Sequence, residues 1–475
     1  MITFFRYLSL LLFLSIPLFA QNSVKDSVVK IYTVAKVPNY SIPWNSSIRR
    51  SHGSGSIIAG NRILTNAHVV ANETFIEVKR YGKTKRYEAE VEFISHQADL
   101  ALLRVKDKEF FEGSKALELG PLPKIQQKVA VYGFPMGGNS LSASTGIVSR
   151  IEHNRYAHSR EIFLSIQIDA AVNPGSSGGP AISDGKIVGV VMQQIKKSQN
   201  LGYLVPTQIV KHFLKDVEDG KYDGFPHLGA SSIKMENEAL REVYKMDKET
   251  TGIMLMDISE VSSIHNILKD GDILLSVDGH QVQNDSTVEF IPEQFTSYMY
   301  YIDQKQIGEE VELELLRDAK KIKIKIKLEN IADDDLLVDT IEHDKMPKYL
   351  IYGGYVFSPL SRNLLVQSRL APLQLKIAAG EWAKKDREEI VVLLKVLADR
   401  TNRGDHNFRL WQVDKIAGKK FKNFDEFVSI LDGYNEKYLL LENNNGIKIA
   451  IDTQKAKDSQ ERILQRYSIE NARSK

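Results

Sequence analysis

The chain has 475 residues, a length that predicts two to four domains. Hydrophobic residues make up 43% of it and charged residues 26%, an ordinary globular balance with enough apolar material for a core. The formal net charge is only +2, so composition gives no support for a polyanionic partner and we expect no nucleic-acid binding. The absence of cysteine excludes disulfides, thiolate nucleophiles and cysteine-bound metals.

The first twenty residues, 1–20, are typical of a secretory signal peptide. Arg6 is the only charge, the apolar run Leu8–Ile16 follows it, and Ala20 offers a small residue for cleavage before Gln21. The run is shorter than the roughly 20 residues of a membrane-spanning helix. An uncleaved N-terminal anchor is the alternative, which the large Leu18 leaves open. An exported chain without disulfides favours the bacterial periplasm.

Residues 24–220 predict an antiparallel β barrel or sandwich. Short apolar segments alternate with turns, and Ser183–Lys186 has the composition of a tight hairpin turn. A helix is expected over Thr207–Glu218, where apolar residues recur at helical spacing. The expected strands are Val28–Val34, Gly55–Ile58, Arg62–Thr65, Leu100–Val105, Val129–Tyr132, Gly146–Ile151, Ile162–Ile168 and Lys186–Met192.

Residues 225–330 predict a second domain, a small one of the α+β class. We expect helices over Ser262–Lys269 and Pro292–Gln304, and strands over Val311–Leu315 and Ile322–Leu328. Lysines alternate with isoleucines over 321–327. We favour a strand with one solvated face over a membrane or nucleic-acid patch, because this alternation is the period of a β-strand.

Residues 374–455 predict a third domain, which repeats the order of elements of the second domain. A strand–turn–strand pattern over Phe408–Lys419 precedes a helix over Asn423–Leu431 and strands over Lys437–Leu441 and Ile447–Ile451. This order indicates a weak internal repeat. Residues 331–373 are expected to connect the second and third domains, and residues 456–475 are expected to form a charged tail.

Nucleophilic cleavage of a peptide bond needs an activated hydroxyl, an oriented base and N–H donors for the oxyanion. The sequence Asn-Pro-Gly-Ser-Ser-Gly-Gly-Pro at 173–180 can turn sharply and present N–H groups inward. We therefore predict Ser177 as nucleophile and the stretch Gly175, Ser176 and Ser177 as oxyanion hole, with the N–H groups of Gly175 and Ser177 as donors. A Gly/Ser loop without function is the alternative for this motif alone.

The candidate base is His68, which follows a predicted strand directly. The candidate acid is Asp99, at the start of an apolar strand where it can be half buried against an imidazole. Each residue alone is more simply explained as structural. The order His68, Asp99, Ser177 along an all-β unit is that of chymotrypsin-like enzymes, which favours a catalytic triad.

Several separated motifs closely resemble those of HtrA/Deg serine proteases. They are Thr65–Val70, Asp99–Leu103, Ile168–Pro180, Gly53–Ser56, Gly133–Gly137 and Gly146–Ser149. Position 176 is Ser where the family usually has Asn, and we expect activity to be kept. The resemblance implies a mainly β fold, a chymotrypsin-like double β-barrel followed by two PDZ-like α+β domains.

The second predicted domain, residues 225–330, is similar to the family's circularly permuted PDZ domain, which binds a peptide as an added strand. The resemblance assigns carboxylate capture to Leu228, Gly229 and Ala230. A small domain that binds nothing is the alternative. The stretch Tyr352–Leu360 and the third predicted domain resemble the plant-type Deg branch, in which a divergent second PDZ-like domain serves assembly.

The resemblance implies an ATP-independent serine endopeptidase that degrades unfolded or damaged exported proteins as a trimer-based homo-oligomer. A pocket beside the strand Ile187–Met192 would accept small to medium aliphatic side chains. Ordering of loops 171–176 and 193–202 would control activity. We expect no cofactor, and we find no metal-ligand cluster and no phosphate-binding loop. The alternatives are a chaperone or scaffold with little proteolysis, and a regulated protease with one signalling substrate.

Overall fold

A computed structural model describes residues 24–136, 138, 140–194, 201–330, 336–368 and 371–474. The predicted signal peptide lies outside these residues. The chain divides into two compact units, each described by itself below. The first holds residues 49–225 with the N-terminal residues up to 35 and the segment 288–306, and the second holds residues 36–48, 226–287 and 307–475. No helix of the described part is long and apolar enough to cross a bilayer.

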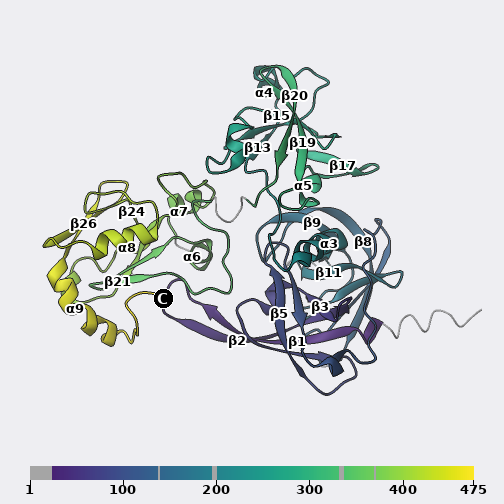
Figure 1. Cartoon of the computed structure of the whole chain (residues 1–475), viewed down its shortest axis with the longest axis horizontal. Coiled ribbons are helices and arrows are strands. Elements are labelled where there is room, and N and C mark those ends of the chain that lie inside the picture. The colour runs from purple at the N-terminus through teal and green to yellow at the C-terminus, as the bar shows by residue number, and fades with distance from the viewer. Residues whose placement is uncertain are drawn as a thin grey trace, which may run out of the picture. The chain divides into compact units, whose positions relative to one another are not determined.

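The first unit contains two closed antiparallel β barrels of six strands each (Figure 1). The first barrel has the order β1-β2-β3-β6-β5-β4. Its alternating apolar side chains, such as Ile31, Ile63 and Leu103, fill the interior. Closure leaves no free strand edge, so the barrel is a rigid support for residues at its rim. The strands are β1 (Val28–Pro38), β2 (Ser46–Ile58), β3 (Arg62–Thr65), β4 (Glu73–Arg80), β5 (Tyr87–Ser95) and β6 (Leu100–Arg104).

The second barrel has the order β10-β11-β12-β9-β8-β7 and a core that includes Val131, Ile166 and Leu204. Helix α3 (Thr207–Asp216) follows its last strand, as predicted, and buries Ile209, Val210 and Phe213. The strands are β7 (Lys128–Gly133), β8 (Ser142–Arg155), β9 (Ile162–Ile168), β10 (Pro180–Ser183), β11 (Lys186–Gln194) and β12 (Gly202–Pro206). The predicted double β-barrel is therefore confirmed.

The segment 288–306 corrects one prediction about the second domain. A helix was expected over Pro292–Gln304, but the structure has a hairpin, β17 (Thr287–Ile291) and β18 (Gln294–Ser297), and then the single turn α5 (Tyr300–Asp303). Glu293 takes the left-handed conformation at the hairpin turn, with φ +64°. Phe290 and Tyr300 pack against the core of the second barrel, so this segment of the predicted residues 225–330 belongs to the first unit.

The hairpin is also tied to the barrel by polar contacts. His153 of β8 lies 2.8 Å from the Thr296 hydroxyl through Nδ1 and 3.0 Å from Asp303 Oδ2 through Nε2. Both side chains of the His153–Asp303 pair are buried. Burial raises the pKa of the Asp303 carboxyl, although its contacts with His153 oppose this shift.

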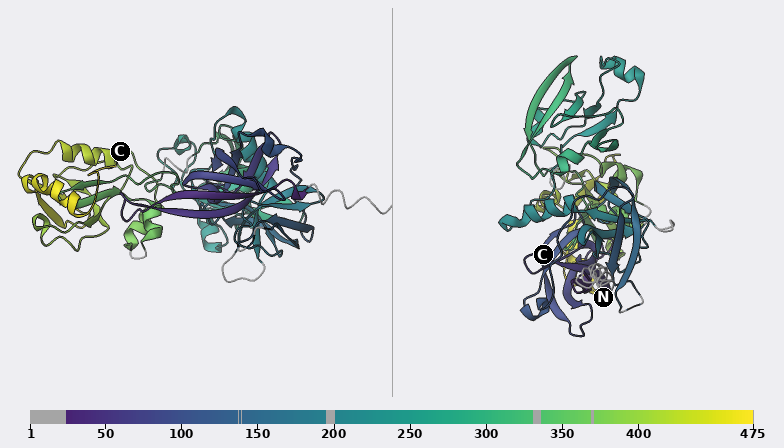
Figure 2. Two further views of the ribbon diagram at one scale, coloured as in Figure 1. Left: turned by 90° about the horizontal axis from the view of Figure 1, so that it is seen from below. Right: turned by 90° about the vertical axis from the view of Figure 1, so that its right-hand side faces the viewer.

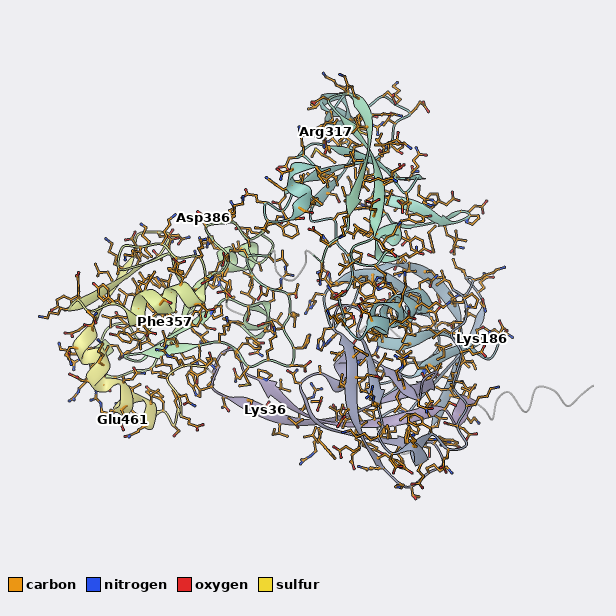
Figure 3. All side chains as sticks on the ribbon, in the orientation of Figure 1. Lys36, Lys186, Arg317, Phe357, Asp386 and Glu461 are labelled. Atoms are coloured by element: carbon orange, nitrogen blue, oxygen red, sulfur yellow. The ribbon has the colours of Figure 1, made fainter. Side chains whose placement is uncertain are left out.

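The PDZ-like part of the second unit is built on an antiparallel sheet with the strand order β13-β14-β15-β19-β20. Arg317 joins Asp272 through two hydrogen bonds of 2.6 and 2.7 Å, which fixes the end of β19 beside the start of β15 (Figure 3). Three lysines of β20 lie opposite glutamates of β19 across the ladder, for example Lys323 opposite Glu314, which explains much of the alternating lysine run. The elements are β13 (Ser231–Lys234), α4 (Glu238–Val243), β14 (Ile253–Met256), the 3-10 turn η3 (Ser263–Asn266), β15 (Ile273–Val277), β16 (His280–Gln281), β19 (Glu310–Arg317) and β20 (Lys320–Lys327).

The C-terminal module begins earlier than the predicted residue 374. Strands β21 (Leu350–Tyr352) and β22 (Tyr355–Pro359) form one sheet with β23 (Val391–Val396) and β24 (Trp411–Val413). The predicted connecting segment 331–373 thus contains part of the module's core. Phe357 of β22 packs on Phe427 of α8, with ring centroids 5.0 Å apart (Figure 3).

The charged tail is also part of this module. Helix α9 (Thr453–Arg466) buries Ala456 and Ile463, and Ile351 donates its N–H to the carbonyl of Ala472 at 2.6 Å. Helix α9 lies at the yellow end of the colour scale in Figures 1 and 2. The remaining elements are α6 (Arg362–Gln367), α7 (Leu373–Ala378), β25 (Lys415–Ile416), α8 (Phe424–Asp432), β26 (Tyr438–Glu442) and β27 (Lys448–Asp452).

Candidate active site

Two strands of the first barrel bring His68 and Asp99 together. His68 lies in the short helix α2 (Ala67–Val70), directly after β3, and Asp99 directly precedes β6. The two strands are paired, with Thr65 opposite Ala101, so the end of one lies beside the start of the other. Asp99 has the unusual φ of +54° and is 1% exposed. Asn66 Nδ2 donates to the carbonyl of Asp99 at 2.8 Å and holds this conformation.

The imidazole and the carboxylate form a closely matched pair. His68 Nδ1 lies 2.8 Å from Oδ2 and 3.0 Å from Oδ1 of Asp99, and the main-chain N–H of His68 donates to Oδ1 at 2.9 Å. This contact places the ring proton on Nδ1 and leaves Nε2 as the basic nitrogen. About 33% of the His68 side chain is exposed, so the ring lies at the surface of the site while the carboxyl lies beneath it.

The pKa values of the pair are shifted in the directions expected for a base and its acid. Burial alone would lower the pKa of His68, but the charge and hydrogen bonds of Asp99 outweigh it, so this pKa is raised. Burial alone would raise the pKa of Asp99, but the contacts with His68 reverse the effect, so this pKa is lowered. The carboxyl is therefore ionised and stabilises the imidazolium form of its partner.

Ser177 lies in a tight loop that is attached to the first barrel. Its carbonyl accepts the N–H of Ser54 at 2.8 Å. Gly178, with φ +82°, leaves no room for a side chain, because a Cβ there would lie 2.2 Å from Thr65 Oγ1 and 3.1 Å from the main-chain nitrogen of Asn66. The loop of Ser177 therefore meets the end of β3, next to the start of the helix that carries His68.

The hydroxyl of Ser177 donates to the carbonyl of Met192 at 3.3 Å. Among the described residues, no hydrogen bond joins this hydroxyl to His68. Hydrogen bonds between nucleophile and base are often long or misaligned in substrate-free enzymes and tighten when substrate binds.

Two peptide planes of the loop are fixed by their carbonyls. The Pro174 carbonyl accepts the N–H of Met136 at 2.7 Å, and the Ser176 carbonyl accepts the N–H of Gly179 at 3.0 Å. Because N–H and C=O of one trans peptide point in opposite directions, the N–H groups of Gly175 and Ser177 face away from these acceptors. The assignment of these two N–H groups as oxyanion donors stays a prediction.

Ser176 lies between the two predicted donors and uses its own N–H within the turn. This N–H donates to the carbonyl of Asn173 at 3.0 Å, which closes the turn. Gly175, with φ +98°, is needed here because a Cβ would lie 2.5 Å from the carbonyl oxygen of Phe134.

Ser54 is the residue of this site that the sequence analysis missed. Its hydroxyl donates to the Gly175 carbonyl at 2.8 Å and accepts the N–H of Phe134 at the same distance. Together with its N–H bond to Ser177, it fixes the loop from both ends. The Gly53–Ser56 motif was the available signal, since glycines around a small polar residue permit close backbone approach.

The predicted peptide site lies at an open sheet edge of the second unit. Strand β13 is the terminal strand of its sheet, and all of its side chains are exposed. Gly229 has φ +60°, while the side chains of Leu228 and Ala230 are buried. The N–H of Gly229 donates to His227 Nδ1 at 3.0 Å, so this predicted carboxylate donor is engaged within its own loop. Residues 195–200 of the loop 193–202, whose ordering is predicted to control activity, lie outside the described residues.

Comparison with known proteins finds matches over both units. A family described as "Trypsin-like peptidase domain" matches residues 53–190, and one described as "PDZ domain" matches residues 338–475. The second match starts before residue 374, as the C-terminal sheet does.

Two relatives from Arabidopsis thaliana match nearly the whole chain. "Protease Do-like 4, mitochondrial" is 37% identical and covers 94% of this chain and 84% of its own length. "Protease Do-like 2, chloroplastic" is 36% identical and covers 95% and 75%. Among solved structures, "HtrA-type protease AlgW with decapeptide" has a TM-score of 0.51 at 22% identity and covers 65% of this chain and 97% of its own. The last match shows a shared fold.

Proposed function

The chain belongs to the Do-like (HtrA/Deg) family of serine proteases and is a serine endopeptidase, and from this premise we propose that it degrades unfolded or damaged polypeptides without ATP. The observation that carries the proposal is the His68–Asp99 pair, 2.8 Å apart, at the point where the loop of Ser177 meets the first barrel. The absence of a phosphate-binding loop from the sequence supports independence from ATP.

In the proposed mechanism Ser177 Oγ attacks the scissile carbonyl and gives its proton to His68 Nε2. Asp99 holds the ring in the required tautomer and stabilises its positive charge. The N–H groups of Gly175 and Ser177 stabilise the oxyanion of the tetrahedral intermediate. His68 then donates the proton to the leaving amine, and water releases the acyl chain by the same steps in reverse order.

For attack to occur, the Ser177 hydroxyl must exchange its bond with the Met192 carbonyl for one with His68. We propose that substrate binding favours this exchange, and that ordering of loops 171–176 and 193–202 sets the active fraction. An extended chain fits such a cleft because its main chain is free to pair as a strand, whereas a folded protein keeps these groups bonded internally.

The substrate class is tested by digesting one polypeptide in two states. A small disulfide-stabilised protein, offered folded or after reduction and blocking of its thiols, is incubated with the enzyme with and without ATP. We expect the unfolded state to be cleaved at least ~100-fold faster, because cleavage of the folded state requires local opening, and ATP to have no effect. Equal cleavage of both states would contradict the substrate class. Suppressed aggregation without cleavage would favour a chaperone.

We propose that the edge of β13 binds the C-terminal end of a peptide as an added strand, with the loop 228–230 capturing its carboxylate. Because the N–H of Gly229 is bonded to His227, the ring must turn away as the peptide binds.

This site predicts a dependence on the terminal charge of the ligand. A labelled peptide with a free C-terminus is expected to bind the inactive Ser177→Ala chain at least ~10-fold more tightly than the same peptide amidated, since hydrogen bonds to a charged acceptor contribute about 1.5–3 kcal/mol. Fluorescence anisotropy measures both affinities. Equal affinities would disprove carboxylate capture at this loop.

We further propose a trimer-based homo-oligomer and an exported location. Export rests on the signal-like residues 1–20, and the periplasm rests in addition on the absence of cysteine. The two Arabidopsis relatives are named mitochondrial and chloroplastic, so membership of the family is compatible with several compartments.

A further inference from the structure

Two further imidazoles lie beside the candidate triad within the first unit. His96 directly follows β5, and His158 lies in the turn between β8 and β9. His96 Nδ1 and His158 Nε2 are 2.9 Å apart, although the residues are 62 positions apart in sequence. The ring of His158 also lies near the ring of His68, with centroids 6.1 Å apart. The proposed triad uses neither His96 nor His158.

The main chain around His96 is fixed by its neighbours. Ser95 Oγ accepts the N–H of Ala98 at 3.1 Å and bonds to the Tyr222 hydroxyl at 2.6 Å. Gln97 Oε1 accepts a hydrogen bond from the same Tyr222 hydroxyl at 3.0 Å. These bonds hold both flanking residues, so His96 projects from a supported turn.

The turn that carries His158 is fixed as well. The N–H of Tyr156 donates to the Glu161 carbonyl at 2.8 Å, and the N–H of Arg160 donates to the Tyr156 carbonyl at 3.0 Å. Tyr156 is fully buried and anchors the turn. Both imidazoles are half-buried, so they remain within reach of solvent. Supported side chains that converge on one point are the condition for a preorganised site.

We propose that His96 and His158 form a binding site for a divalent transition-metal ion of the zinc type, and that the bound ion inhibits proteolysis. Two nitrogens bonded to one tetrahedral zinc at about 2.0–2.1 Å lie roughly 3.3 Å apart. The observed 2.9 Å is within a small side-chain adjustment of this separation. The ring that now holds the proton between the two nitrogens loses it there and is protonated on its other nitrogen. Two neutral imidazole nitrogens then face the metal and occupy two of its coordination positions.

The ligand type decides the class of ion. Neutral imidazole nitrogens suit zinc, copper and nickel, whereas magnesium and calcium require oxygen ligands. Two imidazoles by themselves hold a zinc ion more weakly and more reversibly than the closed set of four ligands in a structural zinc site. The sequence gives no sign of this pair, because two histidines so far apart have no local metal-ligand spacing.

Inhibition follows from the position of the ion and rests on the proposed function. His68 must become positively charged as it accepts the proton of Ser177. A doubly charged cation on the neighbouring imidazole disfavours this charge by Coulomb repulsion. The ion therefore raises the barrier to the first chemical step without contact with the nucleophile.

Metal binding is tested separately from activity. The full chain carrying Ser177→Ala, stripped with a chelator, is titrated with zinc in a calorimeter. We expect one zinc ion per chain, and an affinity at least ~10-fold lower after His96→Asn or His158→Gln. His265→Asn changes an exposed histidine of the second unit and serves as the matched control, which should bind as the parent does. Unchanged affinity in both ligand variants would overturn the site.

Inhibition is then measured with the active chain and an unfolded substrate. Zinc should inhibit the unmodified enzyme, chelator should restore it, and magnesium should have no effect. His96→Asn and His158→Gln should need at least ~10-fold more zinc for the same inhibition. Zinc binding without inhibition would disprove the regulatory role but would still support the metal site. Failure of all variants to cleave in chelator would contradict the proposed function, while the calorimetric result would still test the metal site.

Discussion

Replacement of Ser177 by alanine is expected to lower the rate of peptide cleavage by about 10⁴–10⁶-fold. Removal of the nucleophile abolishes the acyl-enzyme pathway, and only binding and oxyanion stabilisation remain. The fold should be preserved, because the Ser177 main-chain bond to Ser54 does not depend on the hydroxyl. Initial rates on an unfolded polypeptide, with circular dichroism as the control for folding, measure the effect.

The adjacent serine provides the matched control for this experiment. Ser176→Ala removes a buried hydroxyl but keeps the main-chain bonds of the turn, so we expect activity within about 10-fold of the parent. A fluorophosphonate probe should label the Ser176→Ala chain and leave the Ser177→Ala chain unlabelled, as read by mass spectrometry. The reverse pattern would transfer the nucleophile to position 176.

Replacement of Asp99 by asparagine should lower kcat by ~10⁴-fold, because an amide can donate to Nδ1 and hold the ring in the wrong tautomer. The variant should also change the pH profile, measured with a chelator present. Since Asp99 raises the pKa of His68, loss of its charge lets burial lower this pKa. The parent loses activity as pH falls through the raised pKa, so in Asp99→Asn the residual activity should persist to lower pH.

A second buried His–Asp pair in the same unit serves as the control. His153 and Asp303 are 3.0 Å apart and about as close as the candidate pair, but they join the β17–β18 segment to the second barrel. Asp303→Asn is expected to leave kcat within a few-fold and to leave the pH profile unchanged. A loss of activity equal to that of Asp99→Asn would mean that burial of an acid, and not its position beside His68, explains the effect.

The candidate triad was predicted from the chain order of its residues and from the resemblance of the surrounding motifs. His68 follows one predicted strand and Asp99 precedes another, and the pairing of β3 with β6 places the two residues side by side. The engagement of the Ser176 N–H in the turn was not predictable, because it depends on the main-chain conformation of the whole loop. The His96–His158 convergence likewise depends on where two turns of different barrels meet.

The domain limits were less predictable than the strands. Segment 292–304 has helical spacing of apolar residues, but Phe290 and Tyr300 are half-buried against the barrel whose strands lie between Lys128 and Pro206, far earlier in the chain. Tertiary packing therefore outweighs the local pattern. The tail was interpreted from its charges, whereas its helix buries only two apolar side chains, Ala456 and Ile463, a signal too sparse to separate from a solvated helix.

The hairpin β17–β18 limits how this protein can be dissected for laboratory work. A recombinant fragment that stops after the last helix of the peptidase would lack Phe290, Tyr300 and the partner of His153, and would expose apolar barrel surface to solvent. A fragment that starts at residue 225 would carry the same apolar side chains with nothing to cover them. Useful fragments therefore retain 288–306 on the peptidase side, for example through a short fused linker.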